Sequence, residues 1–171
     1  MATLPMSSSL AKPRLLRIQV GGWTGRRAFV LKKKEAVSSI IQRLSFEAVD
    51  GEDIPPVIPG QFTTVWVPVE GEGKHGKYTE QPRHYTLAIP SSGEEGCLSI
   101  SVKKEGIVSS YLHEAAIGSK WDLSAPRGCF VMSGVEKLWL TVPDAPIVFL
   151  SAGVGITPGM SLFGRLSCCL A

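Results

Sequence analysis

The chain from residue 23 onward consists of short apolar stretches separated by turn residues. Residues 39–49 alternate between apolar and polar side chains, which is typical of a strand with one buried face. Proline and glycine gather at 51–60, where a turn region interrupts the pattern. Strands are predicted over residues 26–34, 39–49, 61–69, 84–89, 97–103, 120–123 and 129–132, and a polar loop is predicted over 70–82.

Little helix is predicted in this part of the chain. Residues 108–116 are expected to form a short helix, and the apolar stretch 137–142 is assigned as an edge segment. Short strands with turn signals at steps of about 8–12 residues indicate a small antiparallel barrel or sandwich. The predicted fold class is therefore mainly β.

The pattern changes after residue 146. Residues 147–150 form a continuous apolar run, which fits a strand buried on both faces of a parallel sheet. A glycine-containing turn and a helical stretch follow, as at the start of a β-turn-α nucleotide-binding unit. We therefore expect a basic tail over 1–22, a barrel over 23–143 and the beginning of an α/β domain over 144–171.

Composition limits the functional classes. The 171 residues are 44% apolar and 19% charged, as in a globular protein of one domain or one domain plus a fragment. No apolar run approaches the ~18 residues of a membrane span. The net charge of +3 hides an asymmetry, because residues 1–34 hold eight Lys/Arg and no acidic residue. Since no basic stripe crosses the folded part, we expect no nucleic-acid partner.

The basic start of the chain bears on localisation. Residues 7–17 are rich in serine, lysine and arginine and free of acidic residues, a composition that resembles an organelle transit peptide. Pro13 interrupts any amphipathic helix there, so a frayed tail or a linker is the alternative. A secretory signal core is absent. We expect a cytoplasmic protein, with mitochondrial import as the alternative.

The cysteines and histidines indicate no metal site. None of the four cysteines forms a Cys-x-x-Cys pair, and the adjacent Cys168 and Cys169 are poor partners for each other. The three histidines are scattered along the chain. Reduced structural thiols and no bound metal or haem are therefore expected.

Two glycine-containing turns are suited to phosphate. Gly153 and Gly155 allow a sharp turn, Thr157 is placed to cap the next helix, and Pro158 suits its first position. Free N–H groups at a helix start suit an anion such as pyrophosphate. Pro158 replaces the third glycine of the dinucleotide fingerprint, so the alternative is a merely tight connection.

The second turn follows the strand that ends near Lys103. Gly106 turns the chain, and Ser109 or Ser110 is expected to open the short helix, again as a phosphate cradle. No Glu or Gln lies three residues after either serine, so no capping box is expected. The alternative is a simple helix cap beside two solvated lysines.

Arg83 and Tyr85 share one face of a predicted strand. A guanidinium binds phosphate with two hydrogen bonds, and a phenol ring offers a flat stacking surface. Together they would suit an anionic, aromatic ligand such as a flavin nucleotide. The alternative is a surface arginine beside a half-buried strand tyrosine.

Taken in order, several segments resemble a known family. They are Pro-Gly-Gln-Phe at 59–62, Arg-His-Tyr-Thr at 83–86, residues 105–112, Ser-Ala-Pro-Arg-Gly at 124–128 and residues 149–158. The set is similar to the ferredoxin-reductase-type flavin domain, and most of all to the reductase half of flavohaemoglobins (nitric oxide dioxygenases). The resemblance implies a Greek-key FAD-binding barrel that passes electrons from NAD(P)H through FAD to an acceptor, a haem globin or another protein.

The resemblance also implies residue roles. Arg83 would bind the FAD pyrophosphate, Tyr85 would pack on the isoalloxazine ring, and Thr86 would hydrogen-bond near flavin N5. Strict strand alternation puts Thr86 on the face opposite to Tyr85, so that contact requires local twist or the Thr86 backbone. The remaining implied FAD-binding residues are Val102, Lys103, Gly106, Val108 and Ser109, and those facing the nicotinamide dinucleotide are Gly153, Gly155, Thr157 and Pro158. The chemistry would belong to the cofactors, with no catalytic side chain.

The resemblance is incomplete at the end of the chain. The family's nicotinamide domain continues for about another domain's length after this turn, whereas 13 residues follow Pro158 here. We therefore expect a truncated reductase. Two alternatives stay open: a flavin-binding or interaction module without its own catalysis, and an electron-transfer domain cut from a fusion, with residues 23–27 at the junction.

Overall fold

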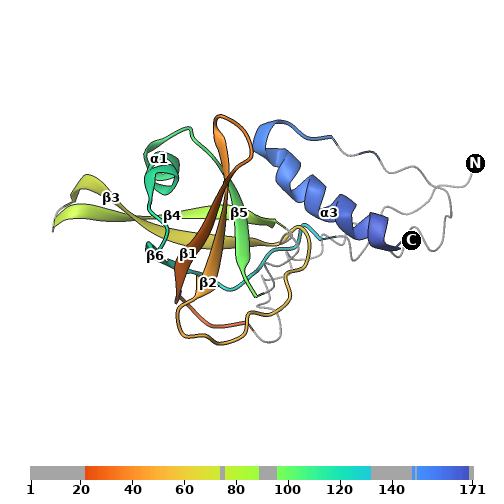
Figure 1. Ribbon diagram of the computed structural model, residues 1–171, viewed down its shortest axis with the longest axis horizontal. Helices are drawn as coiled ribbons and strands as arrows, with labels where there is room; N and C mark the ends of the chain where they lie inside the picture. The colour runs from red at the N-terminus through yellow and green to blue at the C-terminus, as the bar shows by residue number, and fades with distance from the viewer. Residues whose placement is uncertain (1–21, 74–75, 89–95, 132–147, 149, 170–171) are drawn as a thin grey trace, which may run out of the picture.

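Six antiparallel strands close into a barrel (Figure 1). The computed structural model describes residues 22–73, 76–88, 96–131, 148 and 150–169. The strand order is β1-β2-β5-β4-β3-β6, in which β6-β3-β4-β5 is a Greek key. This confirms the predicted mainly β barrel. The strands are β1 (Arg27–Ala36), β2 (Ile41–Ala48), β3 (Phe62–Gly73), β4 (Gly76–Ala88), β5 (Leu98–Lys103) and β6 (Lys120–Leu123).

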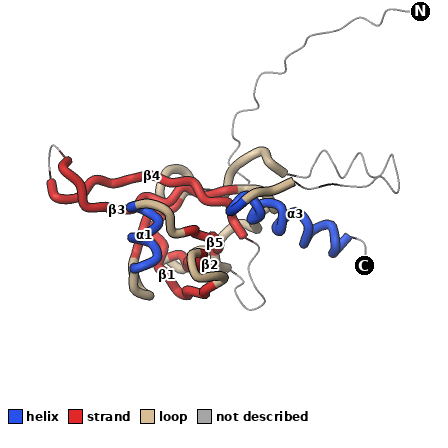
Figure 2. The backbone as a smooth tube through the Cα atoms, turned by 90° about the horizontal axis from the view of Figure 1, so that it is seen from above, coloured by secondary structure: helices blue, strands red, loops and turns tan. Residues whose placement is uncertain are grey.

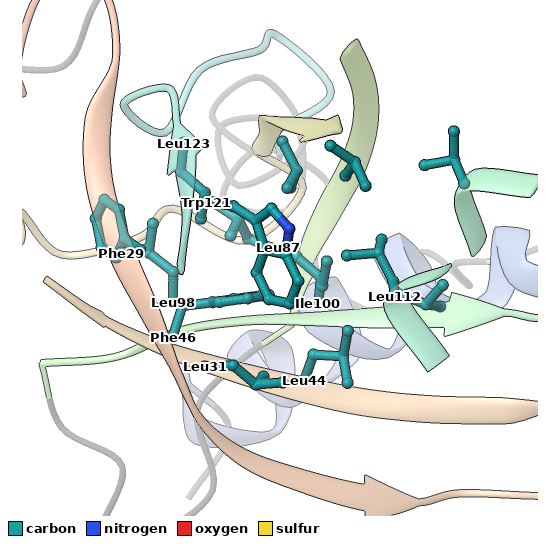
Figure 3. Close-up of a cluster of buried hydrophobic side chains, with 14 of the residues drawn as sticks. Phe29, Leu31, Leu44, Phe46, Leu87, Leu98, Ile100, Leu112, Trp121 and Leu123 are labelled. Atoms are coloured by element: carbon teal, nitrogen blue, oxygen red, sulfur yellow. The ribbon is translucent and has the colours of Figure 1, made fainter. Parts of the chain in front are cut away.

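The barrel interior is filled by alternate residues of its strands. Phe29 and Leu31 from β1 and Leu44 and Phe46 from β2 are fully buried. Figure 3 shows these side chains in one cluster with those of Leu98, Ile100, Trp121 and Leu123 from the other strands. Phe46 and Trp121 meet edge to face, with centroids 5.9 Å apart. Each such side chain contributes about 1.5–3 kcal/mol by burial, so the alternation in the sequence sets the barrel's inner face.

Helix α1 (Ile107–Glu114) lies in the connection from β5 to β6 and covers the barrel core. Val108 and Leu112 belong to the hydrophobic core. Lys34 Nζ donates to the carbonyl oxygens of His113 (2.5 Å) and Ala115 (2.9 Å), so a cation satisfies the C-terminal end of the helix. These contacts hold the helix start in a fixed position relative to the barrel.

The predicted polar loop over 70–82 is wrong. Strands β3 and β4 pair without interruption from Phe62↔Thr86 to Glu70↔Tyr78, and Gly73 pairs with Gly76. The hairpin projects beyond the barrel (Figures 1 and 2). A two-stranded ribbon outside a barrel has no core face, so it lacks the apolar alternation by which a strand is recognised.

Two further strand predictions are wrong in the described residues. Residues 129–131 are not in a strand; one isolated bridge joins Arg127 to Phe62 before them. Val148 and Leu150 are not in a strand either, and they are 77% and 95% exposed. No described strand pairs with these two residues. Ile147, Phe149 and the predicted edge segment 137–142 lie outside the described residues.

A second helix packs against the barrel on the side away from the hairpin (Figure 2). The 3-10 turn η2 (Gly153–Gly155) leads into α3 (Ile156–Cys169). Ser161 Oγ donates to the carbonyl oxygen of Leu87 in β4 at 3.2 Å, and Leu162 is buried. Within the described part of the chain, no helix is long and apolar enough to cross a bilayer.

Arg27 ties β1 to the turn after β2. Its Nε and Nη2 donate to the two carboxylate oxygens of Asp50 at 2.8 and 2.6 Å, and Nη2 also donates to the Glu52 carbonyl oxygen at 2.6 Å. The guanidinium lies 5.1 Å from the Trp23 ring centroid. This hydrogen bonding holds the pKa of the Asp50 carboxyl below its usual value.

We expect Asp50→Asn to lower the free energy of unfolding at neutral pH. The folded-state pKa is depressed, so the stabilisation is present above the ordinary pKa of 3.8 and is lost as the pH falls through the folded-state value. Urea unfolding of both proteins at a series of pH values measures this. Glu47→Gln, which removes the exposed partner of Lys32, is the control and should change little. A difference that stays constant as the pH falls through the folded-state pKa would contradict the linkage.

Candidate functional site

The barrel opens between β4 and β5. These strands pair only at Leu87↔Ile100 and Ala88↔Ser99, whereas β3 and β4 pair along most of their length. Beyond Leu87 the two strands diverge, and a cleft of about 770 Å³ lies between them and the start of α1. The residues lining it are Val69, Thr79, Gln81, Arg83, His84, Tyr85, Thr86, Ser101, Lys103, Glu105, Gly106, Ile107, Val108, Ser109 and Thr157.

The edge of β4 that faces the cleft carries backbone donors. The Leu87 N–H donates to Gln61 O on the β3 side at 2.9 Å. Backbone groups of successive strand residues point to alternate edges, so those of His84 and Thr86 point away from β3, toward the edge from which β5 has diverged. The pairing register supports this orientation. Phe62 is the β3 partner of Thr86, and its backbone N–H and carbonyl bond to Arg127 and not to β4.

The open edge of β4 bears on the predicted role of Thr86, whose side chain lies on the face of the strand opposite to Tyr85. Tyr85 and Thr86 project to opposite faces of β4, yet both line the cleft. Where a strand has no neighbour, side chains from both of its faces border the same space. Thr86 therefore borders the same cleft as Tyr85.

Tyr85 forms an apolar wall of the cleft. Its ring is half-buried and packs against the barrel core. Burial raises the pKa of the phenol above its usual value near 10, and the positive charge of Arg83 partly offsets this. The phenol is therefore neutral at physiological pH and offers a flat, uncharged surface.

Arg83 supplies a free cation. Its Nη1 donates to the Pro82 carbonyl oxygen at 2.8 Å and to Gln81 Oε1 at 3.4 Å, both neutral acceptors. Among the described residues, no carboxylate lies within ion-pair distance of Arg83. An exposed guanidinium held by neutral acceptors beside a cleft keeps its charge available to an anion.

The other cation of the cleft is engaged. Lys103 forms an ion pair with Glu105, and both side chains line the cleft. Val102, the residue before it, has its side chain fully buried in the barrel core. Its carbonyl oxygen lies 2.8 Å from His113 Nε2, so Val102 could meet a ligand only through its backbone.

The cap at the start of α1 differs from the prediction. Gly106 is the N-cap and Ser109 is the third helical residue, so neither Ser109 nor Ser110 opens the helix. Ser109 Oγ accepts from the backbone N–H groups of Gly106 (2.8 Å) and Glu105 (2.9 Å). Ser109 thus accepts from the N–H of the N-cap residue, as the glutamate of a capping box does. A search for Ser-x-x-Glu does not detect a serine in this role. Val108 packs into the core while also bordering the cleft.

The second glycine turn lies at the rim. α3 begins at Ile156, so Thr157 and Pro158 occupy its first turn and Thr157 is not the cap. Proline is tolerated there because the first N–H groups of a helix have no acceptor within it. Of the residues predicted here, Thr157 lines the cleft, whereas Gly153, Gly155 and Pro158 do not.

Several lining residues were missed from the sequence. Thr79 and Gln81 lie on the same strand face as Arg83 and Tyr85, at intervals of two residues. They would have been found if the strand had been extended back through the predicted loop. Ser101 shares one face of β5 with Lys103 and would have been found in the same way. His84 lies on the face of β4 opposite to Arg83 and Tyr85 and gave no such signal. The described residues contain no cluster of His, Cys, Asp and Glu that could hold a metal ion.

The chain is similar to the FAD-binding domain of oxidoreductases and to flavohemoproteins. The family described as oxidoreductase FAD-binding domain matches residues 28–132. A flavohemoprotein of Pseudomonas aeruginosa is 36% identical over 143 residues, which cover 83% of this chain and 33% of that protein. Flavohemoprotein A of Dictyostelium discoideum is 37% identical over 154 residues, with 84% and 36% covered. The chain thus spans about a third of the length of the curated relatives it matches.

Solved structures of FAD-binding proteins also align with this chain. The flavohemoglobin of Malassezia yamatoensis, with bound FAD and heme, aligns with a TM-score of 0.68 and 25% identity, covering 84% of this chain and 35% of that one. The FAD/NAD binding domain of the nitric oxide dioxygenase of Vibrio cholerae aligns with a TM-score of 0.67 and 29% identity, covering 84% and 57%. The barrel shares its fold with these structures.

We expect the Tyr85 phenol to ionise above pH 10. Because the folded-state pKa is raised, the stability it confers is complete below the unfolded-state value and is lost as the pH rises through the folded-state value. Ultraviolet titration of the wild type, with Tyr85→Phe subtracted, isolates this group. Arg83→Ala should raise the pKa further, since it removes a neighbouring positive charge. Ionisation at or below pH 10 would contradict the packing of Tyr85.

Proposed function

The chain belongs to the oxidoreductase FAD-binding domain family, and on that premise we propose that it binds FAD in the cleft between β4 and β5. The electrons would come from NADH or NADPH and pass through FAD to an acceptor, as in the reductase part of a nitric oxide dioxygenase. The observation that carries the proposal is the cleft itself, where the Tyr85 ring, the Arg83 cation and the open edge of β4 meet.

The residues present fit FAD. A flavin ring needs a flat apolar surface, which Tyr85 offers, and donors for its carbonyl oxygens and ring nitrogens, which the N–H groups of His84 and Thr86 offer. A pyrophosphate needs positive charge, which Arg83 offers without a competing carboxylate. The volume of about 770 Å³ suits a ligand of this size.

The start of α1 would hold the phosphates from the other side. The Ile107 and Val108 N–H groups lie in the first turn, where the helix dipole favours an anion. Glu105 is unfavourable at this place, and its ion pair with Lys103 cancels both charges. Arg83 is therefore the residue on which we expect anion binding to depend most.

These contacts assign different roles to the cofactor and to the protein residues. FAD, when bound, supplies the ability to accept a hydride and to release its electrons to the acceptor. The protein residues would bind and orient it: Tyr85 would cover one ring face, the N–H groups of His84 and Thr86 would meet the ring edge, and Arg83 and the start of α1 would hold the phosphates. No side chain is assigned as a general acid or base.

The proposal extends to the domain division, the nicotinamide site and the electron acceptor. Residues 23–143 would form the FAD-binding unit, and residues 144–171 would begin the unit that binds the nicotinamide dinucleotide, with Thr157 at the rim of the cleft. The acceptor would be a haem globin or another electron-transfer protein. A second candidate is flavin binding without reduction by NAD(P)H, which the exposed, non-strand positions of Val148 and Leu150 favour.

We expect Arg83→Ala to weaken FAD binding about 10- to 100-fold, because a charge-assisted contact contributes about 1.5–3 kcal/mol. Titration of the deflavinated protein with FAD, followed by quenching of flavin fluorescence, measures this. Arg26→Ala is the matched control, because Arg26 pairs with Glu80 and does not line the cleft. Equal affinity in wild type and Arg83→Ala would remove Arg83 from the site.

Reduction of the bound flavin by NADH or NADPH distinguishes the oxidoreductase from the flavin-binding module. Under anaerobic conditions, NADH or NADPH should bleach the 450 nm flavin band, on the order of one equivalent per flavin, if the nicotinamide site is functional. Photoreduction of the same sample is the control for a reducible flavin. A flavin that light reduces and neither nucleotide reduces would favour the binding module, and a protein that takes up no FAD would overturn both.

A further inference from the structure

A row of hydrogen-bonded side chains crosses the outer face of β3 and β4 and ends at the cleft. Arg127 Nη2 donates to Thr64 Oγ1, and Thr64 Oγ1 lies 2.9 Å from His84 Nδ1. The His84 ring packs edge-on against Phe62, with centroids 5.2 Å apart, and lines the cleft. We call Arg127, Thr64 and His84 the relay.

The relay determines which imidazole nitrogen carries the proton. Arginine can only donate, so it occupies a lone pair of Thr64 Oγ1. Thr64 is 1% exposed, and its hydroxyl hydrogen needs an acceptor. Among the described residues, His84 Nδ1 is the acceptor within reach. Nδ1 therefore accepts, and the proton of the neutral ring lies on Nε2.

The surroundings of Arg127 leave Thr64 as its partner in the relay. Within the described chain, no carboxylate pairs with Arg127, whose Nε is buried without a hydrogen-bond partner. Its Nη2 donates to the Thr64 hydroxyl oxygen, and the Thr64 hydroxyl in turn has His84 Nδ1 as its acceptor.

The other ring nitrogen of His84, Nε2, is then a hydrogen-bond donor at the cleft. No described residue accepts from His84 Nε2, and the backbone N–H groups of His84 and Thr86 face the same open edge. We propose that His84 Nε2–H donates a hydrogen bond to the acceptor edge of the bound flavin ring, and that Thr64 and Arg127 are the residues that fix its tautomer. This rests on the proposed function, in which FAD occupies this cleft.

The competing explanation is that His84 only packs against Phe62. Two substitutions distinguish these roles. His84→Phe keeps an aromatic ring against Phe62 and removes both hydrogen bonds. His84→Gln loses the ring, but its Oε1 can accept from Thr64 while its amide N–H donates onward.

The tautomer is tested first, on the full chain without FAD. The ¹⁵N chemical shifts of the His84 ring are expected to show an unprotonated Nδ1 and a protonated Nε2, and Thr64→Val is expected to abolish that preference. Thermal unfolding of each variant shows that the fold is retained. A ring protonated at Nδ1 in the wild type would overturn the relay, whether or not the protein binds FAD.

The contact with flavin is tested by FAD titration and by Raman spectroscopy of the bound, oxidised flavin. We expect His84→Phe to weaken FAD binding about three- to tenfold, as for one hydrogen bond, and His84→Gln to restore affinity to within about twofold. The ring carbonyl and C=N stretching frequencies should shift in His84→Phe only. Unchanged affinity and frequencies in His84→Phe, or equal losses in both variants, would overturn the proposal. If the wild type binds no FAD, the proposed function fails instead.

Discussion

The divergence of β4 from β5 is the constraint on which the rest of the site depends. A closed barrel satisfies its backbone groups by pairing every strand with two neighbours, and β4 lacks one neighbour beyond Leu87. Backbone groups left there need water or a ligand, because an unpaired buried group is costly. The divergence also creates the space. It lets residues from both faces of β4 border one cleft, and the start of α1 lines the same cleft as Arg83.

Electrostatics inside the cleft are set by which charges are already paired. Lys103 and Glu105 neutralise each other, and the Gly106 N–H is bonded to Ser109 Oγ. Arg83 keeps neutral partners and hence an available charge. The cleft therefore combines one free cation, the first turn of a helix and an uncharged Tyr85 ring, a combination that selects for a ligand with both phosphate and a flat ring system.

Sequence reasoning succeeded where a local pattern reports a buried face. The strands around Phe46, Val65 and Ile100 were predicted because their alternate residues fill the barrel. It failed in the hairpin over 70–82, which has no core face, and at Val148 and Leu150, where an apolar run has no strand to pair with. It also misplaced the cap of α1, since Ser109 acts from inside the helix.

By itself, the sequence indicated the family through the resemblance of its ordered motifs, and the alternation of apolar and polar residues predicted the barrel. It also named Arg83 and Tyr85 as the residues that bring charge and aromatic surface to the cleft, because a shared strand face is a local property of the chain. Only the tertiary structure decided that β4 and β5 separate beyond Leu87, that Thr86 shares a cleft with Tyr85, and that Arg127 reaches His84 through Thr64. These depend on which strands pair and where pairing ends. A hydrogen bond between residues far apart in the chain leaves no period in the sequence.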